Sequence, residues 1–317
     1  MENRGQAEAR LRLDWVDVAR GLGILAVVIG HVWTRGPLRD AMYSFHMPLF
    51  FLLSGMLSRP HPVGDFTRRQ VIGQKRPYAV FLAALLALDQ VIETAKGHRP
   101  IFHQWPEDIV PILLGGFWLR GPFTIFWFVP CLMVARILFN LALNRWPDPF
   151  DRRWAIALPP MLALAYALGW WTQASVLGLL SVPMAFVLLW VGAAWPRLRW
   201  HNGMILPLGL LALAGLSGLS PTINMKAADY GWPLLSIGSA VATSLLLVRL
   251  SASVAPFARP IAALGRESLA IMYCHVAVIH YLTPYLDKLW LLALALLIPV
   301  ALARLIRLSP RLARWLL

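Results

Sequence analysis

Cysteine, acidic residues and long polar segments are all scarce in this chain of 317 residues. Only two cysteines are present, and 15 Asp and Glu residues stand against 29 Lys and Arg. Because Cys131 and Cys274 both lie inside apolar segments, the sequence supports neither a disulfide framework nor a thiolate metal site. We interpret both as packing thiols, and we predict no metal.

Internal repeats, low-complexity segments and any stretch long enough for a soluble domain are also lacking. Apolar sequence dominates instead: 59% of the residues are hydrophobic, 14% are charged and the mean hydropathy is +0.63. A soluble domain of this length does not need so much apolar surface. The composition therefore predicts an all-α polytopic membrane protein whose chemistry is built from the helices and loops of one domain.

The first apolar run is preceded by mixed charges, which is not typical of a cleaved signal. Residues 1–13 contain both Glu and Arg and lead directly into a segment that carries Asp17 and Arg20. We expect this first helix to remain in the protein. The predicted parts are a cytosolic tail over 1–14, a single membrane domain over 15–307 and a basic cytosolic tail over 308–317.

Apolar runs bounded by Pro, Gly and charged clusters predict about ten membrane-crossing helices. Each run is close to the ~20 residues that cross a bilayer. The predicted spans are 15–34, 41–58, 77–94, 124–143, 154–171, 176–195, 204–219, 233–250, 267–284 and 288–307. The stretch 107–119 is apolar but short and is interrupted by glycines, so we expect a re-entrant or interfacial segment there.

The net charge of +14 is concentrated in short loops between the predicted spans. With the N-terminus in the cytosol, 20 Lys and Arg residues fall on the cytosolic side and seven on the other. The positive-inside rule explains this bias, so we expect no nucleic acid partner. Counting 107–119 as a crossing would invert every later loop and abolish the bias.

Ionisable residues inside the first apolar helix are the most informative feature of the chain. Arg20 and His31 are eleven residues apart, so at about 100° per residue they differ by roughly 20° around the helix and by about 16 Å along it. His46 opens the returning span at the same level as His31. A near-neutral imidazole suits removal of a proton from a hydroxyl. The alternative is a histidine that only makes an interhelical hydrogen bond.

Other polar groups near these helices allow two interpretations each. Asp17 precedes Arg20 by three residues, so it either belongs to a buried polar network or only forms a local salt bridge. At Ser54 the following Gly55 permits a close approach of either a ligand or a neighbouring backbone. The loop residues Arg68, Arg69, Lys75 and Arg76 either grip a phosphate-bearing ligand from the cytosol or serve as topology signals.

Four later residues are weaker candidates for a substrate pocket. Trp127 either lines a sugar or acyl pocket or is an interfacial anchor. Asp229 lies in a predicted outer loop that either binds a polar substrate or is plainly solvated. Glu267 lies at a helix start, where capping also explains it, and His275 follows within the span.

At these positions the chain resembles the integral membrane acyltransferase-3 family, particularly its branch similar to fucose 4-O-acetylase. The resemblance runs over nearly the whole chain and is most specific in the first two helices. It rests on Asp17-x-x-Arg20-Gly21, the Arg-x10-His spacing ending at His31, Phe45-His46-Met-Pro-Leu-Phe-Phe, Ser54-Gly55, Lys75-Arg76-Pro77-Tyr78, Trp127-Phe128-Val129-Pro130, and Gly265-Arg266-Glu267-Ser268-Leu269 with His275.

The resemblance implies transfer of an acyl group, usually acetyl, from cytosolic acyl-CoA to a hydroxyl of a carbohydrate or lipid-linked glycan at the bacterial inner membrane. Residues and resemblance together predict His31 as general base supported by Arg20, Asp17 and His46. Acyl-CoA is then expected at Arg76 and its basic neighbours. Direct transfer and an acyl-histidine intermediate both stay open. From another class of function, a transporter or flippase of a lipid-linked sugar is the alternative, because buried charges also mark transport pathways.

The charge bias predicts that both termini and the 145–153 loop lie in the cytosol. Reporter fusions at the C-terminus and in this loop should therefore report a cytosolic location, because basic loops are retained on that side. An outer location for either fusion would contradict the predicted topology.

Overall fold

The computed structural model describes the backbone of residues 2–317 and the side chains of residues 14–317. Side chains 1–13, which make up most of the predicted tail over 1–14, lie outside the described residues. Within the described part the regular structure is helical, without strands. The helices are α1 (Glu2–Val32), α2 (Pro37–Tyr43), α3 (His46–Met56), α4 (Val63–Ala95), α5 (Ile109–Leu114), α6 (Phe128–Arg145), α7 (Arg152–Trp171), α8 (Val182–Ala194), α9 (Ile205–Leu216), α10 (Leu235–Val254), α11 (Arg259–Arg266), α12 (Ser268–Leu282), α13 (Lys288–Arg307) and α14 (Pro310–Leu316).

Seven helical segments within the described residues are long and apolar enough to cross a membrane. The number rises to eight if α11 and α12, which meet at an angle of 81°, form one broken span. The protein is therefore a multi-pass membrane protein, whereas the count of ten is not confirmed. Two of the expected spans contain only short helices, because α3 has 11 residues and α9 has 12.

The short helix α3 lies in the interior, where its length does not have to match a bilayer. It packs against α1, α8 and α10, and nine of its 11 residues are buried. A helix that is apolar on every side and buried on every side contacts protein rather than lipid. The sequence pattern is the same in both cases, which explains why 41–58 reads as an ordinary span.

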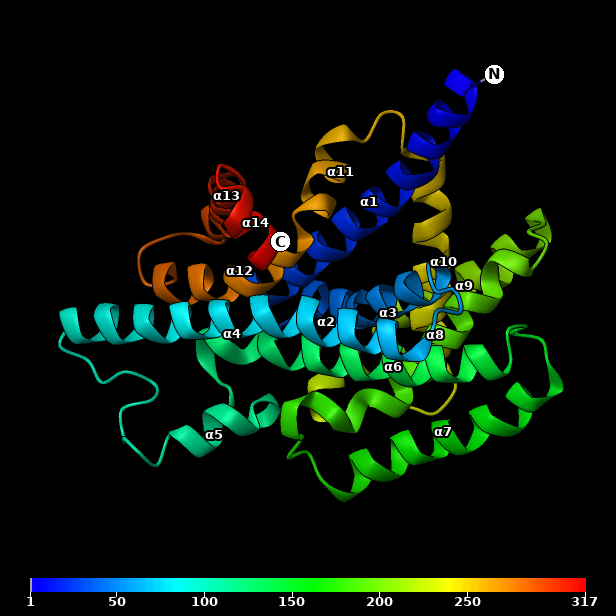
Figure 1. Ribbon diagram of the computed structural model, residues 1–317. Helices are drawn as coiled ribbons and strands as arrows, with labels where there is room; N and C mark the ends of the chain where they lie inside the picture. Colours follow the sequence, from blue (N-terminus) through cyan, green and yellow to red (C-terminus); the bar gives the residue numbers. More distant parts are fainter. Residues whose placement is uncertain (1) are drawn as a thin grey trace.

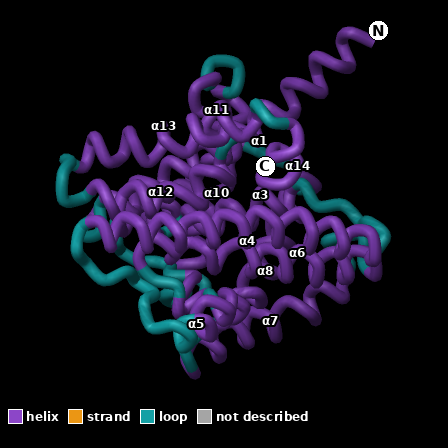
Figure 2. The backbone as a smooth tube through the Cα atoms, turned by 60° about the vertical axis from the view of Figure 1, so that its left-hand side comes forward, coloured by secondary structure: helices purple, strands orange, loops and turns teal. Residues whose placement is uncertain are grey.

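Several of the connections between helices lie at two opposite ends of the bundle (Figure 1). The α3–α4 and α6–α7 connections lie at one end, while the α4–α5 and α12–α13 connections lie at the other. The 60° turn of Figure 2 again shows loops gathered beside α5 and the α12–α13 connection. The segment 107–119 lies at this second end and contains only the six-residue α5 and one short turn, which is too short to cross a bilayer.

Asp89 connects α12 and the α4–α5 connection at the second end of the bundle. Its buried carboxylate accepts hydrogen bonds from the Tyr281 hydroxyl at 2.7 Å and from the Ile101 backbone N–H at 2.8 Å. One side chain of α4 thus holds both α12 and the connection that follows α4. This arrangement fixes the end of α12 that borders the candidate site.

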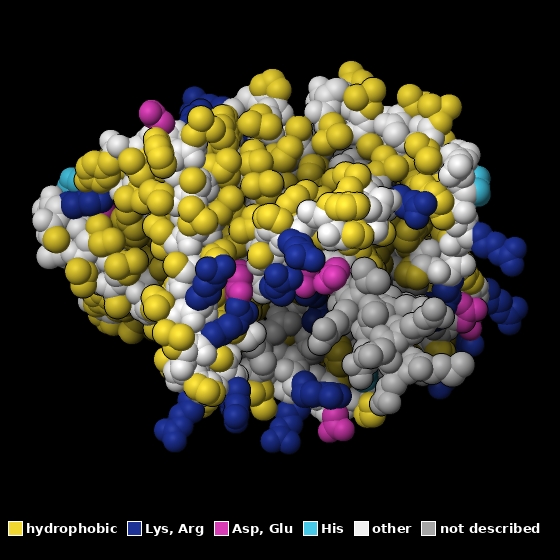
Figure 3. Space-filling view, turned by 90° about the horizontal axis from the view of Figure 1, so that it is seen from above, with side chains coloured by type: hydrophobic (Ala, Val, Ile, Leu, Met, Phe, Trp, Pro, Cys, Tyr) yellow, Lys and Arg dark blue, Asp and Glu magenta, His cyan; other side chains and the backbone are white. Residues whose placement is uncertain are grey.

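The outer surface of the bundle is largely apolar. Large hydrophobic side chains such as Ile156, Trp170 and Leu297 are exposed, as expected for helices that face lipid. Figure 3 shows one face on which hydrophobic side chains predominate and Lys and Arg gather toward its lower and right-hand parts.

The predicted basic tail over 308–317 contains the short helix α14, which packs back onto α4. The Arg76 guanidinium lies 4.5 Å from the centre of the Trp315 ring. Such a cation–π contact is worth about 0.5–1 kcal/mol at an exposed site. One of the cations expected to meet a phosphate is therefore engaged by the C-terminal helix.

Gly55 explains how closely α3 and α8 pack. A Cβ at this position would collide with the backbone carbonyl of Leu189, so the missing side chain admits a backbone rather than a ligand. The Gly55→Ala substitution should destabilise the protein by about 1–3 kcal/mol, as overpacking does. Thermal unfolding of the purified protein in detergent measures the effect.

The matched control is Gly209→Ala on α9, where a Cβ would meet nothing within 4 Å. It should leave the midpoint unchanged or raise it slightly, because Ala is favoured over Gly in a helix. Equal midpoints for the two variants would show that α3 and α8 do not need this contact.

Candidate active site

Two cavities open along α1, one near each of the ionisable residues predicted from the sequence. The first, which we call the histidine cavity, has a volume of about 610 Å³ and is lined by His31, Arg39, His46, Trp127, Lys226 and His280 among others. The second, the arginine cavity, has about 460 Å³ and is lined by Arg20, Ser54, Gln74, Arg136, Arg266 and Ser268 among others. Arg20 and His31, predicted to lie on the same side of α1 and about 16 Å apart along it, therefore line two different cavities.

His31 is held by a histidine from the other end of the sequence. Its Nδ1 lies 2.9 Å from Nε2 of His275 on α12, and the two rings stack with centroids 5.0 Å apart. His275 in turn bonds through Nδ1 to the Ile271 carbonyl at 2.7 Å. The side chain of His275 is fully buried.

This chain of hydrogen bonds determines where the protons lie. The Ile271 carbonyl can only accept, so Nδ1–H of His275 donates to it, and the Nε2 of a neutral His275 carries a lone pair. That lone pair accepts Nδ1–H of His31. The Nε2 of His31 is left unprotonated, which is the form that a general base requires. His275 therefore holds the ring of His31 in this tautomer.

His46 lies on the same cavity in a different arrangement. Its Nδ1–H donates to the Met42 carbonyl at 2.7 Å, and its ring meets Tyr43 edge-on with centroids 4.7 Å apart. The sequence correctly placed His31 and His46 at one level. His46 has no hydrogen bond to His31, so it does not orient that ring, and its side chain faces the cavity instead.

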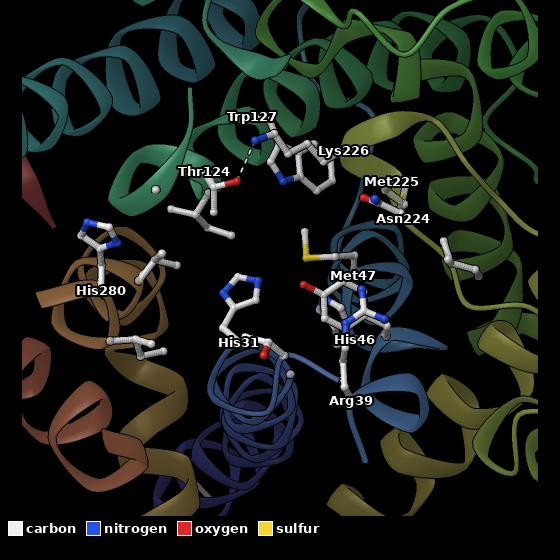
Figure 4. Close-up of a pocket in the computed structure, with 18 of the residues that line it drawn as sticks. His31, Arg39, His46, Met47, Thr124, Trp127, Asn224, Met225, Lys226 and His280 are labelled. Carbon is white, nitrogen blue, oxygen red and sulfur yellow. Dashed lines mark hydrogen bonds between the residues drawn. The ribbon is translucent and has the colours of Figure 1, made fainter. Parts of the chain in front are cut away.

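Lys226 contributes a cation to the opposite wall of the histidine cavity (Figure 4). Its Nζ donates to the Leu119 carbonyl at 2.7 Å and to the Thr124 hydroxyl at 2.6 Å. The residue comes from the short 3₁₀ turn Met225–Ala227, between α9 and α10. Burial and, to a smaller extent, the charge of Arg120 together lower the pKa of Lys226 from its ordinary value to about 8.

Three arginines from three helices line the arginine cavity. Arg20 lies on α1, Arg136 on α6 and Arg266 at the end of α11. Asp17 lies 4.0 Å from Arg20 and 3.7 Å from Arg266, so it balances part of their charge. Arg136 has no ion pair within the described residues, and its buried Nε lacks a hydrogen-bond partner there. Such a site is suited to an anion, because an arginine can hold phosphate through two hydrogen bonds.

Aromatic side chains lie between the two cavities. Trp127 lines the histidine cavity, and the next residue, Phe128, lines the arginine cavity. On α3, Met47 lines the histidine cavity, and Phe50, about one turn later, lines the arginine cavity. The Phe50 and Phe128 rings meet edge-on with centroids 6.0 Å apart. These side chains therefore lie on the route of a molecule that reaches from one cavity to the other.

The remaining predicted site residues are distributed unevenly around these cavities. Ser54 lines the arginine cavity and Trp127 the histidine cavity. Glu267 is instead paired with Arg307 of α13, and the exposed Asp229 accepts from the Gly231 backbone N–H in its own turn. These two carboxylates make structural contacts and line neither cavity.

The basic residues of the predicted donor loop lie at the edge of the arginine cavity. All four side chains are exposed on the first half of α4, where Gly73, Gln74 and Pro77 of the same helix line the cavity. A shallow neighbouring hollow is lined by Asp65, Arg68, Arg69, Ile72 and Gly73. The structure thus places the predicted cations beside this cavity without bringing them inside it.

Several lining residues were not selected from the sequence. Arg39 lies in a predicted loop, Thr124 at the start of a predicted span and His280 near the end of one, and none of them stood out as a site residue. Arg136 carried a signal that could have been used, because a lone arginine within an apolar span is costly unless it has a partner or a ligand. Among the described residues, no group of three or more His, Cys, Asp or Glu side chains is arranged to hold a metal ion.

Fold and site together define a polytopic helical membrane protein with a hydrogen-bonded histidine pair at one cationic cavity and a second, arginine-lined cavity along the same helix. Residues 13–306 match the family model of the acyltransferase-3 domain, described as an acyltransferase domain. The chain therefore belongs to the acyltransferase-3 family and is a membrane acyltransferase. None of the curated proteins and none of the solved structures compared with it matches.

Proposed function

We propose that the protein is an O-acyltransferase of the branch similar to fucose 4-O-acetylase, located in a bacterial inner membrane with both termini in the cytosol. The donor is acetyl-CoA or another acyl-CoA, and the acceptor is a hydroxyl of a carbohydrate or a lipid-linked glycan. The observation that carries this proposal is the hydrogen-bonded row His31–His275–Ile271, which leaves a basic imidazole nitrogen on a cavity large enough for a sugar.

In this mechanism the acceptor hydroxyl gives its proton to Nε2 of His31 and its oxygen attacks the thioester carbonyl. The tetrahedral intermediate collapses with cleavage of the C–S bond, and the proton on His31 passes to the departing thiolate. The imidazolium that forms in between is stabilised by its Nδ1–H bond to His275, as in other base–orienter pairs. Attack by His31 itself, to give an acyl-histidine, uses the same nitrogen and is the second possible route.

The donor fits the arginine cavity on chemical grounds. Its phosphate groups need cations, which Arg20, Arg136 and Arg266 supply. The exposed cations of α4 lie around the same entrance and are suited to attract the donor from the cytosol. The acyl arm then passes between Phe50 and Phe128 toward His31, so the acyl group crosses the protein interior rather than the lipid.

His31→Ala should lower turnover by about 10²- to 10⁴-fold, as loss of a general base does, while binding of CoA persists because the arginine cavity is untouched. His275→Ala should cause a larger loss than His46→Ala, since only His275 holds the Nδ1–H of His31. Release of CoA by the purified protein measures turnover. Near-normal turnover in His31→Ala would remove the base from the proposal, and absence of thioester consumption in the wild type would favour a transporter.

Arg136→Gln should weaken CoA binding by about tenfold or more, because loss of a charged hydrogen bond to phosphate costs about 1.5–3 kcal/mol. Arg153→Gln is the matched control, because Arg153 is exposed and already paired with Asp151 at 2.8 Å. Combined removal of the charges at Arg68, Arg69, Lys75 and Arg76 should reduce affinity less than Arg136→Gln alone, since these side chains lie outside the cavity. Unchanged affinity in Arg136→Gln would place the donor elsewhere.

A further inference from the structure

The histidine cavity is cationic, and no carboxylate lines it. Its ionisable side chains are His31, Arg39, Tyr43, His46, Lys226 and His280. Arg39 is compensated by the neighbouring Asp40, 2.8 Å away, and it also lies over the Tyr43 ring. Lys226 forms no ion pair with any described residue, so its charge is the one left unbalanced.

The surroundings of Lys226 hold it in place without neutralising it. Two of its three ammonium hydrogens are used by neutral acceptors, the Leu119 carbonyl and the Thr124 hydroxyl. The segments packed against its turn, 116–118 and 176–181, contain no charged residue. The nearby charge of Arg120 has the same sign. One donor remains for a molecule bound in the cavity.

A partly buried cation without a counter-charge costs free energy that an anionic ligand recovers on binding. A neutral sugar offers only hydroxyl groups, which cannot balance the charge. Electrostatic complementarity would also exclude neutral competitors of the same shape. The cavity is therefore better matched to a charged acceptor than to a neutral one.

We propose that the acceptor is an acidic saccharide, in which a carboxylate or phosphate binds Lys226 while a hydroxyl elsewhere on the sugar faces His31. This inference rests on the proposed function, because it takes the histidine cavity as the acceptor site. It adds the charge class of the substrate and assigns Lys226 as the residue that selects it.

The test compares matched pairs of sugars bound to the full-length protein in detergent, by ligand-observed NMR. Methyl glucuronide against methyl glucoside tests a carboxylate, and glucose 6-phosphate against glucose tests a phosphate. At least one acidic sugar should bind about tenfold tighter than the neutral sugar of the same pair. The pair that shows this preference identifies the anionic group as a carboxylate or a phosphate. Lys226→Met should abolish the preference, whereas Lys288→Met, which removes an exposed lysine at the start of α13, should retain it.

A pH series tests whether the charge of Lys226, rather than the shape of its side chain, is responsible for the preference. With a pKa of about 8, Lys226 loses its proton as the pH rises, so affinity for the acidic sugar should fall about tenfold between about pH 7 and about pH 9. Lys226→Arg keeps its charge throughout this range and should bind with little dependence on pH. This variant also shows that the cavity folds when Lys226 is replaced.

Three results would overturn the inference: equal affinity within every pair, a preference that survives in Lys226→Met, or no saturable binding of any acidic sugar. A parallel assay of CoA release keeps this test apart from that of the proposed function. If Lys226→Met slows transfer to neutral and acidic sugars alike, Lys226 stabilises the oxyanion, so the charge inference fails while the acyltransferase stands. If acidic sugars bind through Lys226 but no thioester is consumed, the proposed function fails and the anion site stands.

Discussion

The carbonyl of Ile271 is the group on which the arrangement of the candidate site depends. Because it can only accept a hydrogen bond, it determines the tautomer of His275 and, through His275, that of His31. In both hydrogen bonds, the backbone carbonyl in α12 therefore decides which nitrogen donates and which group accepts. The tautomer of a side chain on α1 is thus determined by a helix that lies more than 200 residues further along the chain, so the packing of α12 against α1 sets the arrangement of the candidate site.

The positions of the helices could largely be predicted from the sequence, because membrane spans follow from apolar runs of sufficient length. Helical phase also predicted that Arg20 and His31 lie on one side of α1, where each now lines a cavity. Two features of the fold could not be predicted in this way. A helix buried in protein and a helix buried in lipid are both apolar all round, so α3 could not be recognised as an interior helix. Pairings between distant segments, such as His31 with His275, depend on helix packing that no local pattern reports.

The conformation of a loop was a third feature that the sequence did not reveal. From the sequence, the segment Met225–Gly231 is an outer loop that either binds a polar substrate or is solvated, and Asp229 was its candidate side chain rather than Lys226. A tight turn with a left-handed residue at Ala228 and a backbone bridge between Asn224 and Asp229 directs the carboxylate into its own loop. The same turn presents Lys226 to the cavity. Which of these two oppositely charged side chains faces the cavity depends on the conformation of the turn, which the residue types did not reveal.

The buried position of α3 has a consequence for how the protein is made. Its 11 residues are too few to hold a bilayer-spanning position alone, and its main partner, α8, is synthesised more than a hundred residues later. Until α8 emerges, the close backbone contact at Gly55 has nothing to pack against. Insertion of α3 is therefore coupled to the completion of the bundle, and the early chain depends on its neighbours or on the insertion machinery to keep this segment from leaving the membrane.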